Sequence, residues 1–270
     1  RSTSLRQPDV SWTPIGENMN GVAEAFGNTR KVLVISTNSH NAVGTLYYST
    51  DLGKTVNKAQ HVLIPSTRII KTVVGSFEKE LLAAGTTGGD VLLSTDGNVW
   101  NSLYKHSKSS QVTAMAFGAD HELFIGFEDY SIVWFPDVTS PTTYQTLPML
   151  VTPADIQADI DDEVPVGITG LGVMNGTLLA TSAGKDVRLE YSSKSKTWAS
   201  DWKSLGLVIE GQERMPQYKA PSFSDIATGQ AGVAVVATFW GVLATKNHGK
   251  QWFKLDSISS DITDLSVSSA

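Results

Sequence analysis

The feature that most constrains this chain is a short polar turn that recurs along the sequence. It first occurs at residues 49–56, which read Ser-Thr-Asp-Leu-Gly-Lys-Thr-Val, and related turns occur at 94–100, 192–198 and 245–252. In such a turn an Asp or Asn side chain accepts hydrogen bonds from nearby backbone N–H groups, Gly adopts a positive φ, and a terminal aromatic ring packs beneath the loop. Because each copy follows a short apolar run, the motif predicts repeated connections between adjacent strands. The residues with these structural roles are Ser49, Asp51, Gly53, Thr55, Ser94, Asp96, Gly97, Trp100, Ser192, Trp198, Asn247, Gly249 and Trp252.

Each turn position follows three strand-like runs in the same order, and the second of these runs is almost entirely apolar. The second runs begin at Val32, Leu81, Leu123, Leu178 and Val233, which are 49, 42, 55 and 55 residues apart. Such a run is expected to be buried on both faces, and a period of about 40 to 50 residues is typical of four-stranded propeller blades. We therefore predict an all-β chain that forms one β-propeller domain of antiparallel blades over residues 1–270. The five full repeats are predicted at 22–61, 68–105, 110–149, 166–206 and 221–259.

The two ends of the chain resemble pieces of a further repeat. Residues 11–16 resemble a fourth strand without its partners, and residues 261–268 resemble an isolated first strand. Because toroids close by pairing their ends, which removes exposed sheet edges, we expect a partial blade formed from both termini. The third repeat has Trp-Phe-Pro-Asp at 134–137 in place of the turn motif, so its loop must be built differently.

The Ser-x-Asp-x-Gly-x-Thr-Trp pattern between a third and a fourth strand resembles the Asp-box (BNR) repeat of β-propellers such as sialidases and sortilin-type receptors. Residues 49–56 come nearest to the full pattern, with Val56 in the place of the Trp. In that family the motif lies away from the active site, so the resemblance implies the fold and leaves the function open.

The sialidases among the proteins that the chain resembles require three converging arginines, a Tyr nucleophile with a Glu partner, and an acidic Asp. The chain has six arginines, and its nearest counterpart of the family's Arg-Ile-Pro element, residues 68–70, follows the first turn and lacks the Pro. We therefore expect a protein without catalytic activity. The alternative is a glycoside hydrolase that uses carboxylates around a central cavity. The candidate carboxylates are Glu128, Asp129, Asp186, Glu210 and Glu213.

A ligand is expected on one face of the propeller. In four-stranded blades, the connections between second and third strands emerge on the same face as those between successive repeats. We call this the connection face, and the opposite side, which carries the repeated turns, the turn face. Flat rings beside hydrogen-bonding groups suit sugar or peptide recognition, so the first hypothesis is a glycan or protein partner bound at the connection face. An assembly or structural factor is a further alternative. The predicted ligand-binding residues are Trp240, Tyr130, Asp129, Asp186, Arg214 and Tyr218.

Composition excludes several other partners and cofactors. A net charge of −6 without a Lys/Arg cluster argues against nucleic acid, and no apolar run approaches the ~20 residues of a membrane span. The absence of Cys removes thiolate metal ligands, and the five His residues are scattered through turns, where we expect them to be solvated. We expect no cofactor. Ca²⁺ at Asp159, Asp161 and Asp162 is a less favoured alternative to a hydrated acidic loop. The missing initiating Met and the sequon at 175–177 lead us to expect a secreted or extracytoplasmic protein.

Overall fold

Nearly all of the secondary structure is β strand. The computed structural model describes residues 19–26, 31–37, 45–51, 54–62, 70–76, 79–148, 167–174, 176–182, 185–192, 197–198, 202–204, 223–228, 232–238, 241–249 and 251–255. Apart from one 3₁₀ turn at Ala119–His121, the regular elements in these ranges are strands. This confirms the predicted all-β class.

The described strands form five sheets, which we number in chain order. Sheet 1 contains β1 (Met19–Phe26), β2 (Lys31–Thr37), β3 (Thr45–Ser49) and β4 (Asn57–Lys58). Sheet 2 contains β5 (His61–Val62), β6 (Ile70–Gly75), β7 (Leu82–Thr86), β8 (Asp90–Ser94) and β9 (Val99–Lys105). Sheet 3 contains β10 (Val112–Phe117), β11 (Leu123–Phe127), β12 (Ile132–Phe135) and β13 (Gln145–Thr146). Sheet 4 contains β14 (Ile168–Met174), β15 (Thr177–Ser182), β16 (Lys185–Ser192), β17 (Thr197–Trp198) and β18 (Lys203–Ser204). Sheet 5 contains β19 (Phe223–Thr228), β20 (Ala234–Thr238), β21 (Gly241–Thr245) and β22 (Phe253–Lys254).

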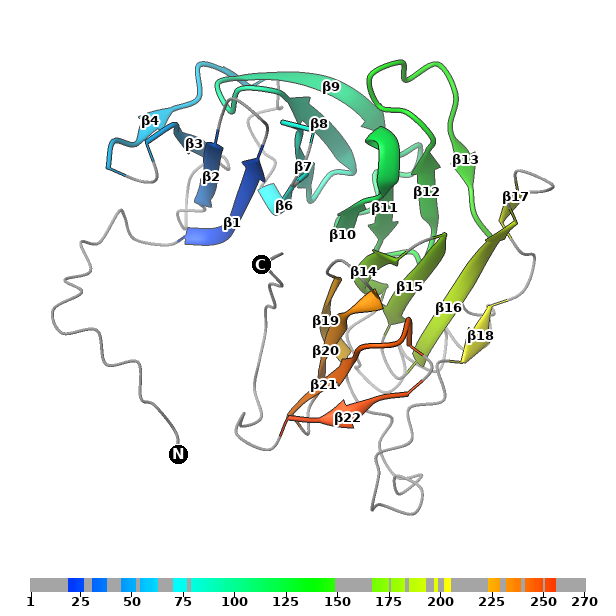
Figure 1. The fold of residues 1–270 in the computed structure, drawn as a ribbon. Coiled ribbons are helices and arrows are strands. Elements are labelled where there is room, and N and C mark those ends of the chain that lie inside the picture. The colour runs from blue at the N-terminus through cyan, green and yellow to red at the C-terminus, as the bar shows by residue number, and fades with distance from the viewer. Residues whose placement is uncertain are drawn as a thin grey trace, which may run out of the picture.

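The sheets follow one another around a common centre, with one edge strand of each sheet innermost (Figure 1). The innermost strands β1, β6, β10, β14 and β19 contact one another in that order. In every sheet the first pair of strands is antiparallel and shows a register shift near the start of the first strand. A shared bulge at one position shows that the five sheets are copies of a single structural unit.

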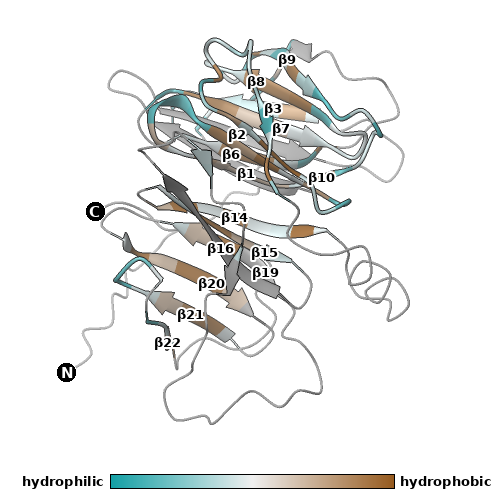
Figure 2. Ribbon diagram, turned by 90° about the vertical axis from the view of Figure 1, so that its right-hand side faces the viewer, coloured by the Kyte–Doolittle hydropathy of each residue, from teal (hydrophilic) through white to brown (hydrophobic). Residues whose placement is uncertain are grey.

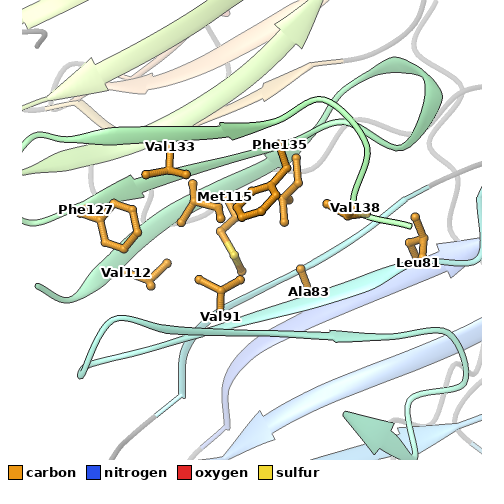
Figure 3. Packing of buried hydrophobic residues seen from close by; sticks show 11 residues of the cluster. Leu81, Ala83, Val91, Val112, Met115, Phe127, Val133, Phe135 and Val138 are labelled. Carbon is orange, nitrogen blue, oxygen red and sulfur yellow. The ribbon is translucent and has the colours of Figure 1, made fainter. Parts of the chain in front are cut away.

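The hydrophobic core lies between neighbouring sheets. All five residues of β7 and all five of β11 are buried, which confirms that these second strands are covered on both faces. Four clusters of buried residues join sheets 1 and 2, 2 and 3, 3 and 4, and 4 and 5. Figure 3 shows the cluster in which Val112, Met115 and Phe135 of sheet 3 pack against Val91 and neighbouring residues of sheet 2. Hydrophobic residues are concentrated along the described strands, whereas hydrophilic residues are frequent in the connections and outer strands (Figure 2).

Glycines allow the sheets to approach closely. Gly85 in sheet 2 and Gly126 in sheet 3 occupy equivalent register positions. Each belongs to the first pair of residues after the bulge. A Cβ at Gly126 would lie 2.7 Å from Ile168 Cγ2 of sheet 4, and a Cβ at Gly85 would overlap Val112 of sheet 3 in the same way. The side chain that begins the next sheet therefore fills the space that a larger residue would need.

The repeated turns have the hydrogen bonds that the sequence predicts. In sheet 2, Asp96 Oδ1 accepts the backbone N–H groups of Asn98 and Val99, both at 2.9 Å, and Gly97 has a φ of 75°. The Trp100 indole packs below and donates its Nε1–H to the Gly97 carbonyl at 2.8 Å. Asn247, Gly249 and Trp252 repeat this pattern in sheet 5, where Asn247 Oδ1 accepts the Gln251 N–H at 2.9 Å and Trp252 Nε1 donates to Gly249 O at 3.2 Å. Gly53 lies outside the described residues, and Ser192 ends β16, paired in register with Thr197.

The connection between β12 and β13, which replaces the repeated turn in sheet 3, differs from the other turns, as predicted. Asp137 accepts hydrogen bonds from the Thr139 N–H at 2.9 Å and the Thr139 hydroxyl at 2.6 Å, and a longer exposed loop follows. The chain also departs from the repeat after β4, because β5 pairs in parallel with β9 of the neighbouring sheet. The Gln60 N–H donates to the backbone oxygen of Asn98 at 3.2 Å, so this segment ties sheet 1 to sheet 2. The predicted terminal strands at 11–16 and 261–268 lie outside the described residues, so closure of the ring stays a prediction.

Candidate functional site

The connections of sheets 2, 3 and 4 join into one surface on the connection face. The segments involved are 87–89, 106–111, 128–131 and residue 167. The His106 N–H donates to Gly89 O at 2.8 Å, and the Glu128 N–H donates to Gln111 O at 2.9 Å. Gly167, with a φ of 99°, lies so close to Glu128 that a Cβ on it would be 2.5 Å from Glu128 Cα. The connection at 106–111 is therefore bonded to both of the sheets that it joins, and the start of sheet 4 packs against the same turn of sheet 3.

The opposite face is built from the other set of turns. The Val138 N–H donates to His121 O, and the His248 N–H donates to Gly232 O, both at 3.0 Å. Each of these bonds joins the turn after a third strand to the turn after a first strand. The described residues thus divide into the two faces that the sequence predicts.

His106 lies at the centre of the surface on the connection face. It is buried, and its ring centroid lies 4.5 Å from that of Phe127. Its Nδ1 accepts the backbone N–H of Ser110 at 3.3 Å, which places the proton of the neutral ring on Nε2. The expectation of a solvated turn residue is wrong for His106, because Phe127 and the adjoining connections cover the ring.

Asp129 holds the turn between β11 and β12 next to His106. Its Oδ1 accepts the Ser131 hydroxyl at 2.6 Å and the Ser131 N–H at 3.2 Å, and its Oδ2 lies 3.5 Å from His106 Nε2. Ser131 Oγ lies 3.4 Å from the same ring nitrogen. A Ser–His–Asp relay needs the hydroxyl and the carboxylate on opposite nitrogens of the ring. This cluster therefore fixes the loops and leaves Ser131 unactivated.

Tyr130 is a correction to the predicted ligand-binding set. It is 0% exposed and has a φ of 63°, a left-handed conformation that a non-glycine residue seldom adopts. Its side chain packs with Ile132 and Ile168 in the cluster between sheets 3 and 4. The ring is part of the core, whereas the flanking Glu128 is exposed and the side chain of Asp129 is 33% exposed.

A second group of charges lies beside the histidine. Lys105 Nζ lies 3.0 Å from Asp90 Oδ1 and also donates to the Gly88 carbonyl, while the Thr86 hydroxyl donates to Asp90 Oδ2 at 2.9 Å. The pairing of Lys105 with Asp90 follows from their opposite positions in the β8–β9 register. Pairing the two strands in antiparallel register from the sequence would have predicted that Lys105 and Asp90 lie opposite each other. Burial raises the pKa of the nearby Tyr104, and the charges of Tyr144 and Asp129 add to this effect.

Asp186 is placed by register at an unusual position. It is paired with Thr181 on β15, where the equivalent third-strand residues of the other four sheets are apolar and no more than 2% exposed. These equivalents are Leu46, Val91, Ile132 and Val242. Sheet 4 thus carries an ionisable residue where its four counterparts carry a buried aliphatic one.

The remaining predicted residues are not brought together by the described structure. Trp240, Arg214, Tyr218, Glu210 and Glu213 lie outside the described residues, as do Asp159, Asp161 and Asp162. Within the described ranges there is no group of three His, Asp or Glu residues placed to hold a metal ion. The same ranges contain no helix long and apolar enough to cross a membrane.

Comparison with known proteins identifies the architecture. No protein-family model and no curated protein matches the chain. Among solved structures, YCF48 bound to D1 peptide is 13% identical with a TM-score of 0.55, over 89% of this chain and 67% of that one. The nidogen/laminin complex gives 10% identity and a TM-score of 0.56, over 90% of this chain and 82% of the other. The fold is a β-propeller. A GH74 xyloglucanase from Xanthomonas campestris is also similar, at 10% identity and a TM-score of 0.59, over 88% of this chain and 38% of the enzyme. At such identities the likeness shows the propeller fold alone.

Proposed function

We propose that the chain is a non-catalytic Asp-box β-propeller that binds a peptide or protein partner through its connection face. The observation that carries this proposal is the surface of segments 87–89, 106–111 and 128–131, which backbone and side-chain hydrogen bonds hold in one arrangement. A preformed surface loses little conformational entropy when a partner binds. The Asp-box assignment is supported by the carboxylate and indole hydrogen bonds of the repeated turns.

The chemistry of the surface favours a peptide over a glycan. Lys105, Lys108 and Glu128 are exposed, and Asp90 and Asp129 of the same surface are half-buried. These charges of both signs match the backbone and side chains of a peptide. Sugar binding is favoured by an exposed aromatic ring, and the rings of Tyr130 and His106 in these segments are both buried. Two of the similar propeller structures are complexes, YCF48 bound to D1 peptide and the nidogen/laminin complex.

A hydrolase remains the alternative because one similar structure is a xyloglucanase. It would use the exposed Glu128 as a reacting group, and it would need a second carboxylate at the separation that glycosidases use. Turnover of a glycoside panel that is abolished by Glu128→Gln would replace the binding proposal with this one.

The binding proposal can be tested with the intact protein on a displayed random-peptide library and a glycan array. We expect selected peptides to bind, and Lys108→Glu and Glu128→Lys each to change their affinity about tenfold or more, because both charges lie on the connection face. Lys54→Glu is the matched control, since Lys54 is exposed on the turn face. Peptides that bind all three variants equally would contradict the proposed surface, and binding to glycans alone would contradict the peptide.

A further inference from the structure

The connection between β12 and β13, on the turn face, carries several hydroxyl groups that make no structural hydrogen bond. Residues 139–146, Thr-Ser-Pro-Thr-Thr-Tyr-Gln-Thr, are all exposed and form the longest exposed run in the described part of the chain. Six of these eight residues carry a hydroxyl and none is charged. The loop lies between β12 and β13 in sheet 3, where the repeated turn is missing.

In the other turns, the Ser or Thr that lies two residues before the Asp or Asn makes a structural hydrogen bond. Ser49 Oγ donates to Asp51 at 2.8 Å, and Thr55 Oγ1 donates to the same carboxylate at 2.7 Å. Ser94 and Thr245 play the same part in sheets 2 and 5. In the connection between β12 and β13 the Thr139 hydroxyl alone is used in this way, through its bond to Asp137. The hydroxyls of Ser140, Thr142 and Thr143 make no hydrogen bond within the described residues.

The backbone nevertheless holds the loop in place. Val138 and Leu147 are buried on either side of it, and the Leu147 N–H donates to Ile132 O at 2.9 Å. The Thr142 N–H donates to Ser140 O at 2.7 Å, and the Tyr144 ring lies 5.2 Å from that of Tyr104. The free hydroxyls are thus presented on an anchored, exposed segment that contains a proline.

We propose that Ser140, Thr142 and Thr143 are acceptors for O-linked glycosylation. Exposed segments rich in Ser, Thr and Pro are typical acceptors. In this reaction the side-chain oxygen attacks the anomeric carbon of a nucleotide- or lipid-phosphate-activated sugar. A C–O glycosidic bond forms, the bond to the phosphate breaks, and the hydroxyl proton passes to a base of the transferase. The proposal assumes a secreted or extracytoplasmic protein, which we also propose.

Phosphorylation of the same hydroxyls fits the loop less well. A phosphate on Ser140 would add two negative charges three residues from Asp137, and the hydrogen bonds from Thr139 lower the pKa of that carboxyl, so it is ionised at neutral pH. No Lys or Arg lies in residues 136–147 to pair with a phosphate. A sugar is neutral and adds no such repulsion.

The test is to secrete the full chain from cultured mammalian cells, measure its intact mass, and locate each adduct by electron-transfer fragmentation. We expect hexosamine-containing adducts on residues 140–143, and we expect their loss in the triple variant Ser140→Ala, Thr142→Ala, Thr143→Ala. The control triple Thr50→Ala, Thr95→Ala, Ser102→Ala removes three other exposed hydroxyls and should leave the adducts in place. Both variants should melt at the wild-type temperature, because they alter exposed side chains only.

An unmodified mass, adducts that map to other hydroxyls, or a phosphate on Ser140 would each overturn the proposal. Since the loop lies on the turn face, the glycosylated and unmodified proteins should bind the selected peptides equally. This readout keeps the modification separate from the proposed binding function.

Discussion

A single carboxylate organises the first repeated turn, and its ionisation should be visible in acid. Asp51 accepts the Thr55 N–H and the Ser49 hydroxyl, both at 2.8 Å. The backbone hydrogen bond from Thr55 contributes most to lowering the pKa of Asp51 from 3.8 to about 2, followed by the hydroxyls of Thr55 and Ser49. Because the folded pKa lies below the unfolded value, the stabilisation is complete above pH 3.8 and is lost as the pH falls towards 2.

We therefore expect the Asp51→Asn variant to have a lower melting temperature than the wild-type protein at neutral pH. The difference between the two melting temperatures should decrease as the pH falls from 4 to 2. Sheet 5 supplies the reverse control, since Asn247 fills the same place with an amide that does not titrate. Asn247→Asp should add acid sensitivity in the same window. Thermal unfolding followed by circular dichroism measures both, and a constant difference for Asp51→Asn across this range would contradict the assignment.

Glu122 shows the opposite perturbation. This half-buried residue precedes β11, and burial raises the pKa of its carboxyl, although its interaction with the Trp134 side chain opposes the shift. The charged form is therefore penalised in the folded state above its pKa, and the penalty disappears below the ordinary value of 4.5, where both states are protonated.

Glu122→Gln removes the charge and keeps a side chain of nearly the same size and shape. We expect it to raise the melting temperature at pH 7 and to leave it near the wild-type value at pH 4. Calorimetry at the two pH values tests this. A lower melting temperature at pH 7 would mean that the charge itself is required.

At the scale of the strand, β16 carries an ionisable residue at a position where its four counterparts are apolar. The register places Asp186 where Leu46, Val91, Ile132 and Val242 are buried in the other sheets. Proteins retain destabilising polar residues mainly where function requires them. We expect Asp186→Val to keep or raise the melting temperature and to weaken partner binding at the connection face.

Val91→Asp in sheet 2 is the matched control for that prediction. It places an Asp at the equivalent register position of another sheet, where the Val is fully buried. It should be strongly destabilising, because an unpaired buried charge costs roughly 3 to 5 kcal/mol. Thermal melts and peptide binding of the two variants separate the outcomes. If Asp186→Val unfolds the protein while binding of its residual folded fraction is unchanged, Asp186 is structural.

The elements were more predictable than the directions of their side chains. The period of the apolar runs and the Ser/Thr-x-Asp/Asn turns depend on local sequence, and they predict strands and connections that the structure contains. The burial of Tyr130 and His106 depends on more than local sequence. A left-handed φ directs Tyr130 into the core, and Phe127 of the next sheet covers His106. The parallel pairing of β5 with β9 is likewise a contact between sheets and has no local signal. The connection face could therefore be predicted, whereas the burial of Tyr130 and His106 within it could not.

At the scale of the whole molecule, the packing of one sheet on the next sets the spacing of the propeller. Ile168, the first residue of β14, enters the space above Gly126, and Val112 does the same at Gly85. Both Ile168 and Val112 are 0% exposed. Because this contact recurs at two junctions, the absent side chains of Gly126 and Gly85 are part of how the sheets are arranged around the centre.

Gly126→Ala should therefore destabilise the protein by about 1 to 3 kcal/mol, since the added methyl overpacks the junction of sheets 3 and 4. Ile168→Ala alone should cost about 2 to 5 kcal/mol by opening a cavity, and in the double variant the new methyl occupies part of that cavity. The two changes should thus be coupled by about 0.5 to 3 kcal/mol in a double-mutant cycle measured by urea unfolding. Leu179→Ala is the control, because Leu179 is equally buried but packs towards sheet 5, and its cost should add to that of Gly126→Ala. Additive costs for Gly126→Ala and Ile168→Ala would show that the two residues do not set the spacing together.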